Sequence, residues 1–192
     1  MICIYTGMDA NQFTQKVQQA MQAAQSEAVN RGHQAVDTEH LLLALCEQEQ
    51  GLIPRLLDKL ERPADVVATE LRRALEKRPS VSGPGSNPGG VAVTQNVQQL
   101  FVDAEKEAKR LKDEYISAEH VLLAILNQAK SDAARVLKDL GITKDAVLGA
   151  LNEVRGRQRV TSADPEATYE ALTKYGQDLV QLARDGKLDP VI

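Results

Sequence analysis

The hydrophobic positions of the chain follow a helical period through most of its length. Over residues 17–28, apolar residues recur at three- and four-residue steps, which places them on one stripe of a long helix. Thr14 precedes that stripe, where its hydroxyl would accept a hydrogen bond from a free backbone N–H. Residues 41–45 form an unbroken apolar run, typical of the most buried helix of a bundle, and Asp37 is suited to cap it. The pattern therefore predicts packed helices.

This pattern recurs eighty residues further along the chain. Over residues 14–75, 20 of 62 residues are identical to the residue eighty positions on. Glu39-His40, for example, matches Glu119-His120. Such agreement indicates an internal duplication. Each copy predicts a long helix, an apolar helix and two shorter ones, the shorter pairs lying near 54–60 and 64–77 in the first copy and near 133–140 and 144–154 in the second.

The expected capping residues recur as well. Thr94 precedes the long stripe of the second copy, and Ser117 precedes its apolar run. Gly141 follows the third helix of that copy, where a left-handed residue commonly ends a helix.

The expected fold class is all-α: two tandem four-helix pseudo-repeats, followed by a linker and one further helix. Residues 79–90 contain three Pro and four Gly, so no packed element is expected there. The expected boundaries are a disordered or artificial N-terminal extension at 1–8, repeat one at 9–78, a connector at 79–93, repeat two at 94–156, a linker at 157–165 and the start of a further, truncated domain at 166–192.

Composition supports helices and excludes several classes of function. Aromatic residues make up 3% of the chain and Trp is absent, so Leu, Val, Ile and Ala must build the core. The two cysteines show no disulfide or zinc pattern, which favours a reducing cytoplasm. No apolar stretch reaches the roughly 18 residues of a membrane helix. The net charge is −4 without a basic stripe, so nucleic acid is not an expected partner. Arg155, Arg157 and Arg159 are interpreted as a solvated hinge.

Candidate catalytic chemistry is sparse. His33, His40 and His120 lack the further ligands that a metal site needs, and neither a nucleophile elbow nor a phosphate-binding loop occurs. His40 and His120 are repeat equivalents, which favours an inherited packing role at a helix start. The chain is therefore expected to be a binding module without cofactor or metal, with an enzyme using His40 or His120 as a remote alternative.

The duplicated unit resembles the Clp N-terminal domain. The matching segments are Phe13–Lys16, Val36–Leu45 and Ile116–Ala124. Three further segments are similar to the ClpB branch of AAA+ disaggregases: Arg78–Gly83, Ala171–Leu179 and Gly186–Ile192. The last is similar to the opening of the first AAA+ module, so the resemblance implies that Asp189, Pro190, Val191 and Ile192 lie near the adenine of ATP in the full-length protein.

The resemblance implies a molecular chaperone that threads aggregated polypeptides through a hexameric motor. Full-length members use ATP and Mg²⁺, form homohexamers and cooperate with the DnaK chaperone system, whereas this fragment is expected to be monomeric. The N domain is expected to bind exposed hydrophobic segments of misfolded proteins. The alternative from the same fold is an adaptor-docking domain of a ClpC- or ClpA-like protease ATPase, which binds a folded adaptor instead.

By position, the residues tied to chaperone function in this family fall on Thr14, Asp113 and Glu119, and the apolar groove falls near Leu100, Phe101 and His120. A structural role stays open for each polar residue: Thr14 as a helix cap, or Glu119 as a favourable charge at a helix N-terminus, worth about 0.3–1 kcal/mol.

The copies differ at several of these positions. Phe101 replaces Met21, Asp113 replaces His33 and Ile116 replaces Val36. A client site on one face is expected at these second-copy positions.

Overall fold

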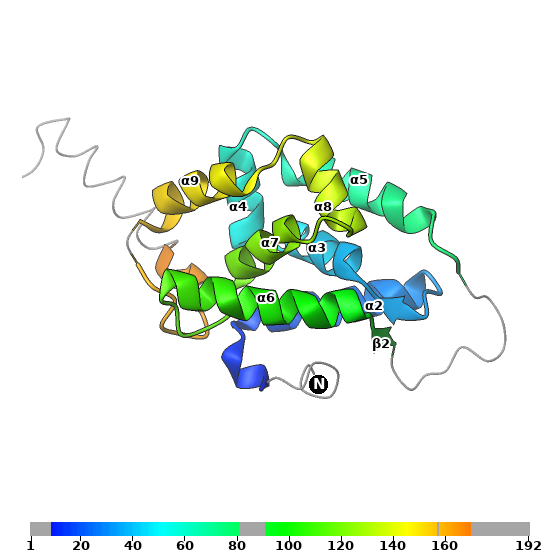
Figure 1. Cartoon of the computed structure of the whole chain (residues 1–192), viewed down its shortest axis with the longest axis horizontal. Helices are drawn as coiled ribbons and strands as arrows, with labels where there is room; N and C mark the ends of the chain where they lie inside the picture. Colours follow the sequence, from blue (N-terminus) through cyan, green and yellow to red (C-terminus); the bar gives the residue numbers. More distant parts are fainter. Residues whose placement is uncertain (1–8, 81–90, 157, 170–192) are drawn as a thin grey trace, which may run out of the picture.

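The computed structural model describes residues 9–80, 91–156 and 158–169 (Figure 1). A 3₁₀ turn, η1 (Ala10–Gln12), leads into the first copy. The helices of that copy are α2 (Gln15–Asn30), α3 (Thr38–Cys46), α4 (Leu52–Lys59) and α5 (Ala64–Glu76), and those of the second copy are α6 (Gln95–Leu111), α7 (Ala118–Asn127), α8 (Asp132–Asp139) and α9 (Lys144–Arg155). The mostly helical fold with two repeats that the hydrophobic pattern predicts is confirmed.

Two short apolar helices form the centre of the fold. Every residue of α3 is buried, and α7 is buried from Ala118 through Ile125. Both helices lie between the long pair, α2 and α6, and the shorter helices α4, α5, α8 and α9 (Figure 1). Gly141 adopts a left-handed conformation after α8, with φ of +72°, as predicted from its place after the third helix.

Short parallel strands join the two copies, a feature that the all-α expectation omits. Strand β1 (Ala35–Val36) pairs with β2 (Ala92–Val93), with Val36 opposite Val93. Phe13 forms an equivalent parallel bridge with Ile116. Phe13 and Val93 are eighty residues apart, as are Val36 and Ile116, so the two pairings are repeat equivalents. Each copy therefore supplies the partner strand of the other.

Thr14 and Thr94 occupy equivalent positions but differ in capping. The Thr94 Oγ1 accepts from the Val97 N–H at 3.3 Å, whereas the Thr14 side chain makes no capping bond. The expected hydroxyl cap at Thr14 is therefore wrong. At this helix start the N–H of Gln15 donates instead to the carbonyl of Ala163 at 2.8 Å, because a segment from beyond α9 lies against α2.

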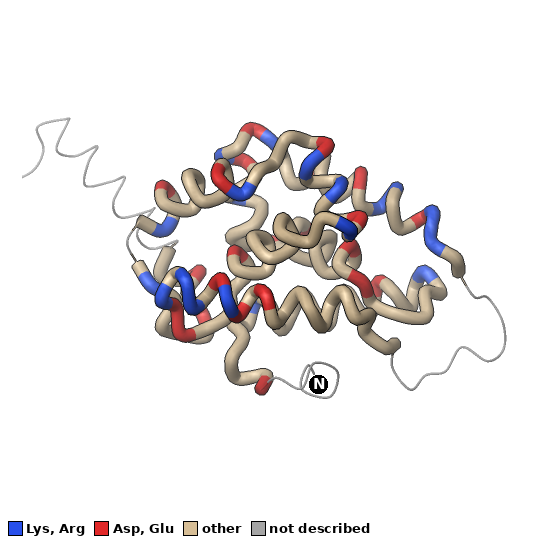
Figure 2. Tube along the Cα trace, viewed as in Figure 1, with Lys and Arg blue, Asp and Glu red and all other residues tan. Residues whose placement is uncertain are grey.

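Several expectations fall outside the described residues. These are the N-terminal extension at 1–8, most of the connector, the residues after 169 and the adenine-contacting Asp189–Ile192. Within the described ranges, no helix combines the length and hydrophobicity needed to span a bilayer. Acidic and basic residues alternate along the helices there (Figure 2).

Candidate functional site

Arg155 is the centre of a buried polar cluster at the start of α7. This residue ends α9 and is 7% exposed. Its Nη2 donates to Asp113 Oδ1 at 2.6 Å, and its Nη1 donates to Glu119 Oε1 at 3.0 Å. Both carboxylate side chains are fully buried. A buried charge is tolerated only when it is paired and hydrogen-bonded, so Arg155 holds the two acids in place.

His120 connects this cluster to the helix cap. Its Nδ1 accepts from the Ser117 N–H at 3.0 Å, so its Nε2 carries the proton and donates to Asp113 Oδ2 at 2.8 Å. In return, the Ser117 side chain accepts from the backbone of His120, which completes a capping box at α7. The predicted packing role of this histidine at the first turn of a helix is confirmed.

Asp113 is held in its charged form. Burial alone would raise the pKa of this carboxyl, but the hydrogen bonds from His120, Arg155 and the Val160 N–H outweigh it and lower the pKa below its ordinary value. Burial likewise opposes the charge of Arg155, yet Asp113 and Glu119 together raise the pKa of the guanidinium. Asp113 and Arg155 are thus a fixed pair of opposite charges.

Ser117, His120 and Asp113 carry the three side-chain types of a hydrolase triad, and the Ser117 Oγ lies 3.0 Å from His120 Nδ1. All three side chains are closed to solvent, however, and the serine oxygen is occupied as a cap. A substrate carbonyl has no approach to it. In the described part of the chain, no group of three or more His, Cys, Asp or Glu could hold a metal ion. Nothing in the geometry favours the enzyme alternative.

A segment following α9 covers the cluster, and we call residues 158–169 the strap. It lies where a linker at 157–165 and the start of a further domain are expected. The Glu114 N–H donates to the carbonyl of Val160 at 2.9 Å, and the Val160 N–H donates to Asp113 Oδ1 at 2.8 Å. Val160 is fully buried and Tyr169 is 1% exposed. The strap therefore packs on the repeats over its described length.

Glu166 is the exception among the strap's contacts. It is 2% exposed, and its carboxyl oxygens have no partner beyond a contact with the backbone N–H of the same residue. Burial, reinforced by the negative charges of Glu119 and Asp164, raises the pKa of Glu166 to about 7. The Oε2 of Glu119 and the Oγ1 of Thr14 are likewise buried without a partner. The surface beneath the strap thus has unused hydrogen-bonding capacity.

The structure brings together four of the six residues predicted for the client site. Asp113, Glu119 and His120 share the Arg155 cluster, and Thr14 lies at the helix start that the strap contacts. Leu100 and Phe101 lie instead in the hydrophobic core, both fully buried. The ring of Phe101 meets that of Phe13 edge to face, with centroids 5.1 Å apart. As positioned, none of the six is open to a client.

The first copy holds a related but more open cluster. Arg78 donates to Asp37 Oδ2 at 2.6 Å and lies 3.5 Å from Glu39 Oε2, but the arginine side chain is 28% exposed. His40 caps α3 as His120 caps α7. Its second nitrogen contacts His33 Nδ1 at 2.8 Å instead of a carboxylate.

The spacing of apolar residues in α9 indicates that Arg155 is buried, which a count of charges does not reveal. Val147, Leu151 and Arg155 follow one another at four-residue steps and share the buried face of α9. A charged residue on a core stripe requires a buried partner of opposite charge. The interpretation of Arg155 as part of a solvated hinge is therefore wrong.

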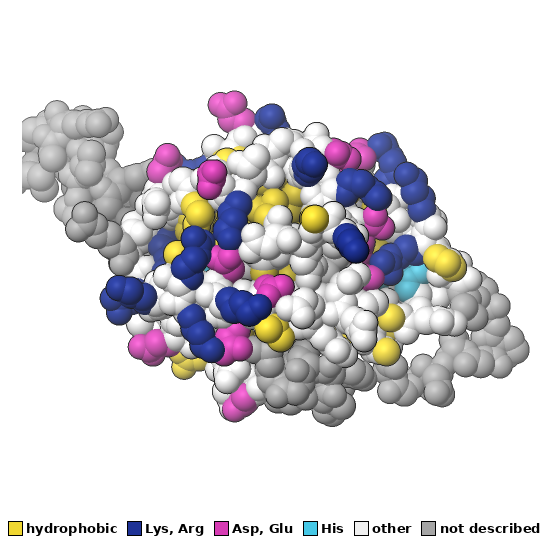
Figure 3. All heavy atoms as spheres, viewed as in Figure 1, with side chains coloured by type: hydrophobic (Ala, Val, Ile, Leu, Met, Phe, Trp, Pro, Cys, Tyr) yellow, Lys and Arg dark blue, Asp and Glu magenta, His cyan; other side chains and the backbone are white. Residues whose placement is uncertain are grey.

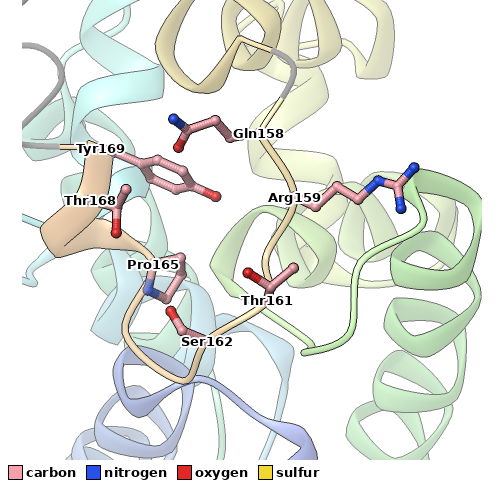
Figure 4. A pocket seen from close by; sticks show the side chains of 7 residues that line it. All are labelled: Gln158, Arg159, Thr161, Ser162, Pro165, Thr168 and Tyr169. Atoms are coloured by element: carbon pink, nitrogen blue, oxygen red, sulfur yellow. The ribbon is translucent and has the colours of Figure 1, made fainter.

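Two concave surfaces occur near the second copy. One, of about 310 Å³, is lined by strap residues near both ends of the segment, from Gln158 to Tyr169. Figure 4 shows the Tyr169 ring reaching across it while Arg159 points away. The other, of about 680 Å³, has an apolar floor including Ala134 and Ile142. The charged residues that line it are Lys130, Arg135, Lys138 and Lys144, of which Arg135 pairs with Asp132 and Lys144 with Glu107. Figure 3 shows hydrophobic atoms near the middle of this face, with both basic and acidic side chains around them.

The comparison with protein families identifies this arrangement. The model of the Clp repeat N-terminal domain matches residues 12–140 and 92–185. The chain belongs to the Clp repeat N-terminal domain family. Its two overlapping matches reflect the duplication that the sequence indicates.

The relatives of this Clp N-domain include ClpB chaperones. The chaperone protein ClpB of Nitratidesulfovibrio vulgaris is 52% identical over 186 residues, which cover 96% of this chain and 22% of that protein. ClpB of Bacillus cereus is 51% identical over 185 residues, or 96% of this chain and 21% of that protein. The chain is therefore homologous to the N-terminal region of ClpB and spans about a fifth of the length of these relatives.

Solved structures share the Clp N-domain fold. The Hsp104 N-terminal domain from Candida albicans superposes with a TM-score of 0.63 at 24% identity, covering 79% of this chain and 96% of that one. A ClpV N-domain in complex with a VipB peptide gives a TM-score of 0.56 at 17% identity, covering 72% and 88%.

Proposed function

We propose that this Clp N-domain is the client-engaging part of an ATP-dependent protein disaggregase, which binds exposed hydrophobic segments of misfolded or aggregated proteins. The observation that carries the proposal is its homology to the N-terminal region of ClpB chaperones over 96% of the chain. The solved complex of a ClpV N-domain with a VipB peptide supports it, because a domain of the same fold there holds a peptide.

The chemistry beneath the strap suits such a client. An unfolded polypeptide offers backbone N–H and C=O groups that must be satisfied when they leave water. The carboxylates of Asp113 and Glu119 accept hydrogen bonds, and the N–H groups of Gln15 and Glu114 donate them. Thr14 contributes a hydroxyl with no partner. Such groups bind a client through its backbone, which all polypeptides share.

In the full-length protein, the proposal includes a homohexameric AAA+ motor that binds ATP and Mg²⁺ and cooperates with the DnaK system in the cytoplasm. The residues expected near the adenine lie outside those that the structure describes. This part of the chain is proposed only to bind polypeptide, whereas nucleotide hydrolysis belongs to the motor.

Nuclear magnetic resonance tests the proposal directly. Isotope-labelled protein is titrated with a permanently unfolded polypeptide, such as reduced and alkylated lactalbumin. We expect chemical-shift changes that include the amides of Gln15, Glu114 and Glu119. If millimolar client changes no amide chemical shift, the proposed function is wrong.

The cationic groove between α7, α8 and the start of α9 favours the second candidate function, docking of an adaptor. Its Lys130 and Lys138 replace Gln50 and Asp58 of the first copy, so the charge belongs to one copy only. An apolar floor with a cationic rim fits an acidic, partly apolar surface of a folded partner. Lys130→Gln with Lys138→Gln should then abolish adaptor binding and leave unfolded clients bound. The matched control is Lys106→Gln with Lys109→Gln on α6.

A further inference from the structure

Residues 158–165 of the strap, which are not helical, lie against the repeats as an extended peptide lies in a binding groove, and residues 166–169 begin a helix. At Val160 both backbone groups are used: its N–H donates to Asp113 Oδ1, and its carbonyl accepts from the Glu114 N–H. Three residues on, the carbonyl of Ala163 accepts from the Gln15 N–H at 2.8 Å. Main-chain hydrogen bonds supply affinity in such complexes, while buried side chains supply selectivity.

The side chains of the strap divide into anchors and exposed positions. Val160, Pro165 and Tyr169 are buried. Thr161 and Ser162 between them are exposed, although Figure 4 shows both beside the small pocket of the strap. The groove therefore selects an aliphatic, β-branched side chain at one position and tolerates polar residues immediately after it.

One residue makes this docking weak. Glu166 is buried with no partner for its carboxyl oxygens beyond its own backbone N–H, and the acids facing it are Glu119 on α7 and Asp164 on the strap itself. Lys16 on α2 is the cation that partly offsets them. A buried carboxyl without hydrogen bonds to other residues opposes docking, and its ionisation opposes it further. The pKa of about 7 means that the docked strap favours a protonated Glu166.

The first copy differs from the second at the residue that holds the Val160 backbone. The residue eighty positions before Val160 is Ser80, which is exposed. The equivalent cluster around Arg78 is correspondingly more accessible. The acceptor for the Val160 N–H is specific to the second copy, where Asp113 replaces His33.

We infer that the strap occupies the groove in which this chain binds its client, and that the client is an extended polypeptide segment whose β-branched aliphatic residue takes the place of Val160. The inference rests on the proposed function and adds to it competition between strap and client and, as a result, self-blocking of the domain. The strap and the client compete for the same backbone donors, Gln15 and Glu114. The domain is consequently self-blocked, and clients bind only to the fraction of molecules in which the strap is displaced.

The first test removes the anchor of the strap. Val160→Asp should release the strap, and Thr161→Asp places the same charge at the neighbouring exposed position as a matched control. Hydrogen exchange at the amides of Gln15 and Glu114 reports whether the strap has left. We expect faster exchange and about tenfold tighter binding of reduced, alkylated lactalbumin in the Val160 variant, with the control unchanged.

The second test strengthens the strap and does not depend on the first variant folding. Glu166→Gln removes the buried charge and keeps the shape of the side chain. We expect slower exchange at Gln15 and Glu114 and about tenfold weaker client binding at pH 8. At pH 5, where the wild-type carboxyl is protonated in the docked strap, the difference should become small because both side chains are then neutral.

A peptide with the sequence of residues 158–169 provides a direct competitor. We expect it to displace lactalbumin from the Val160→Asp protein, and the same peptide with Asp at the valine position should not. Faster exchange at Gln15 and Glu114 without tighter client binding would overturn the inference, as would client binding that is insensitive to Glu166→Gln at pH 8. Either result leaves the proposed function standing if wild-type protein binds lactalbumin. The proposed function itself fails if wild-type protein does not bind lactalbumin at millimolar concentration.

Discussion

His33 and Asp113 stand at equivalent positions of the two copies, and each contacts the histidine that the copies share. His33 Nδ1 lies 2.8 Å from His40 Nε2, and Asp113 Oδ2 lies 2.8 Å from His120 Nε2. One histidine therefore has a neutral partner and the other an anionic one. The two copies should therefore respond differently to acid.

Acid should destabilise the first copy through His40. Burial, with His33 and Arg78 nearby, lowers the pKa of His40 to about 4 from an ordinary 6.5. Because the unfolded chain binds the proton more readily, stability is full above pH 6.5 and falls as the pH drops toward 4. The expected loss is about 2–3 kcal/mol. Urea denaturation at pH 7.5 and 4.5 measures it in a Glu166→Gln background, because the raised pKa of Glu166 acts in the opposite direction over this range. An unchanged midpoint in that background would contradict the assignment.

Giving His40 a carboxylate partner, as His120 has in Asp113, should raise the lowered pKa of His40. His33→Asp places a carboxylate beside His40 Nε2, and an adjacent negative charge favours the protonated imidazole. We expect the pKa of His40 to rise by more than about one unit. A ¹⁵N NMR titration of the imidazole gives the value directly. A pKa that stays near 4 would mean that burial, and not the partner, controls His40.

Replacing Arg155 should be among the most damaging single changes. Arg155→Met fills similar space but leaves Asp113 and Glu119 buried without their cation, at a cost of about 3–5 kcal/mol. Arg78→Met should cost much less because that side chain is 28% exposed and its partners are closer to water. Arg159→Met, at an exposed position, is the neutral control. Equal effects of the three variants on urea unfolding would contradict the central role of Arg155.

A client-binding role of Thr14 can be distinguished from a helix-capping role. Its Oγ1 is buried without a partner, so Thr14→Val should leave stability unchanged or raise it by up to about 1 kcal/mol. Thr94→Val should cost about 1 kcal/mol because its cap bond to Val97 is lost. If Thr14 contacts clients, the first variant weakens lactalbumin binding without destabilising the fold. A destabilised Thr14→Val protein would restore the capping interpretation.

Two glycines of the second copy should respond to alanine with opposite signs. Gly141 has a φ of +72°, which an alanine adopts only under strain, so Gly141→Ala should cost about 1 kcal/mol. Gly149 lies within α9 with nothing near an added methyl group, and Gly149→Ala should stabilise by about 0.5–1 kcal/mol. Thermal unfolding compares the two, and a shift of the same sign in both would contradict this account.

The sequence predicted the helices and the packing role of the two histidines at helix starts because both follow from local spacing. The period of Val17 and the apolar residues after it defines α2, and the shared Glu-His pair lies within the first turn of α3 and of α7. Repeat equivalence then assigned His40 and His120 the same structural role.

The missed features depend on contacts between distant segments. The strand pairs Val36–Val93 and Phe13–Ile116 are too short for any periodicity. Residues 158–165 of the strap have no helical or strand period, so only their tertiary bonds reveal their place, whereas the further helix expected after the linker does begin at residue 166. The surroundings of Asp113 likewise depend on Arg155 and Val160, which follow it by more than forty residues.

The strand pairs Val36–Val93 and Phe13–Ile116, in which each copy supplies a strand to the other, explain why the two repeats gain stability from being in one chain. A single repeat would carry a leading strand without a partner and a receiving strand with its edge open. Two such molecules could complete each other only by dimerising, at a rate and extent set by their concentration. Covalent linkage of the two repeats replaces that association with an encounter inside one chain, whose effective concentration does not fall on dilution. Folding of this domain should therefore be independent of how much of it the cell contains.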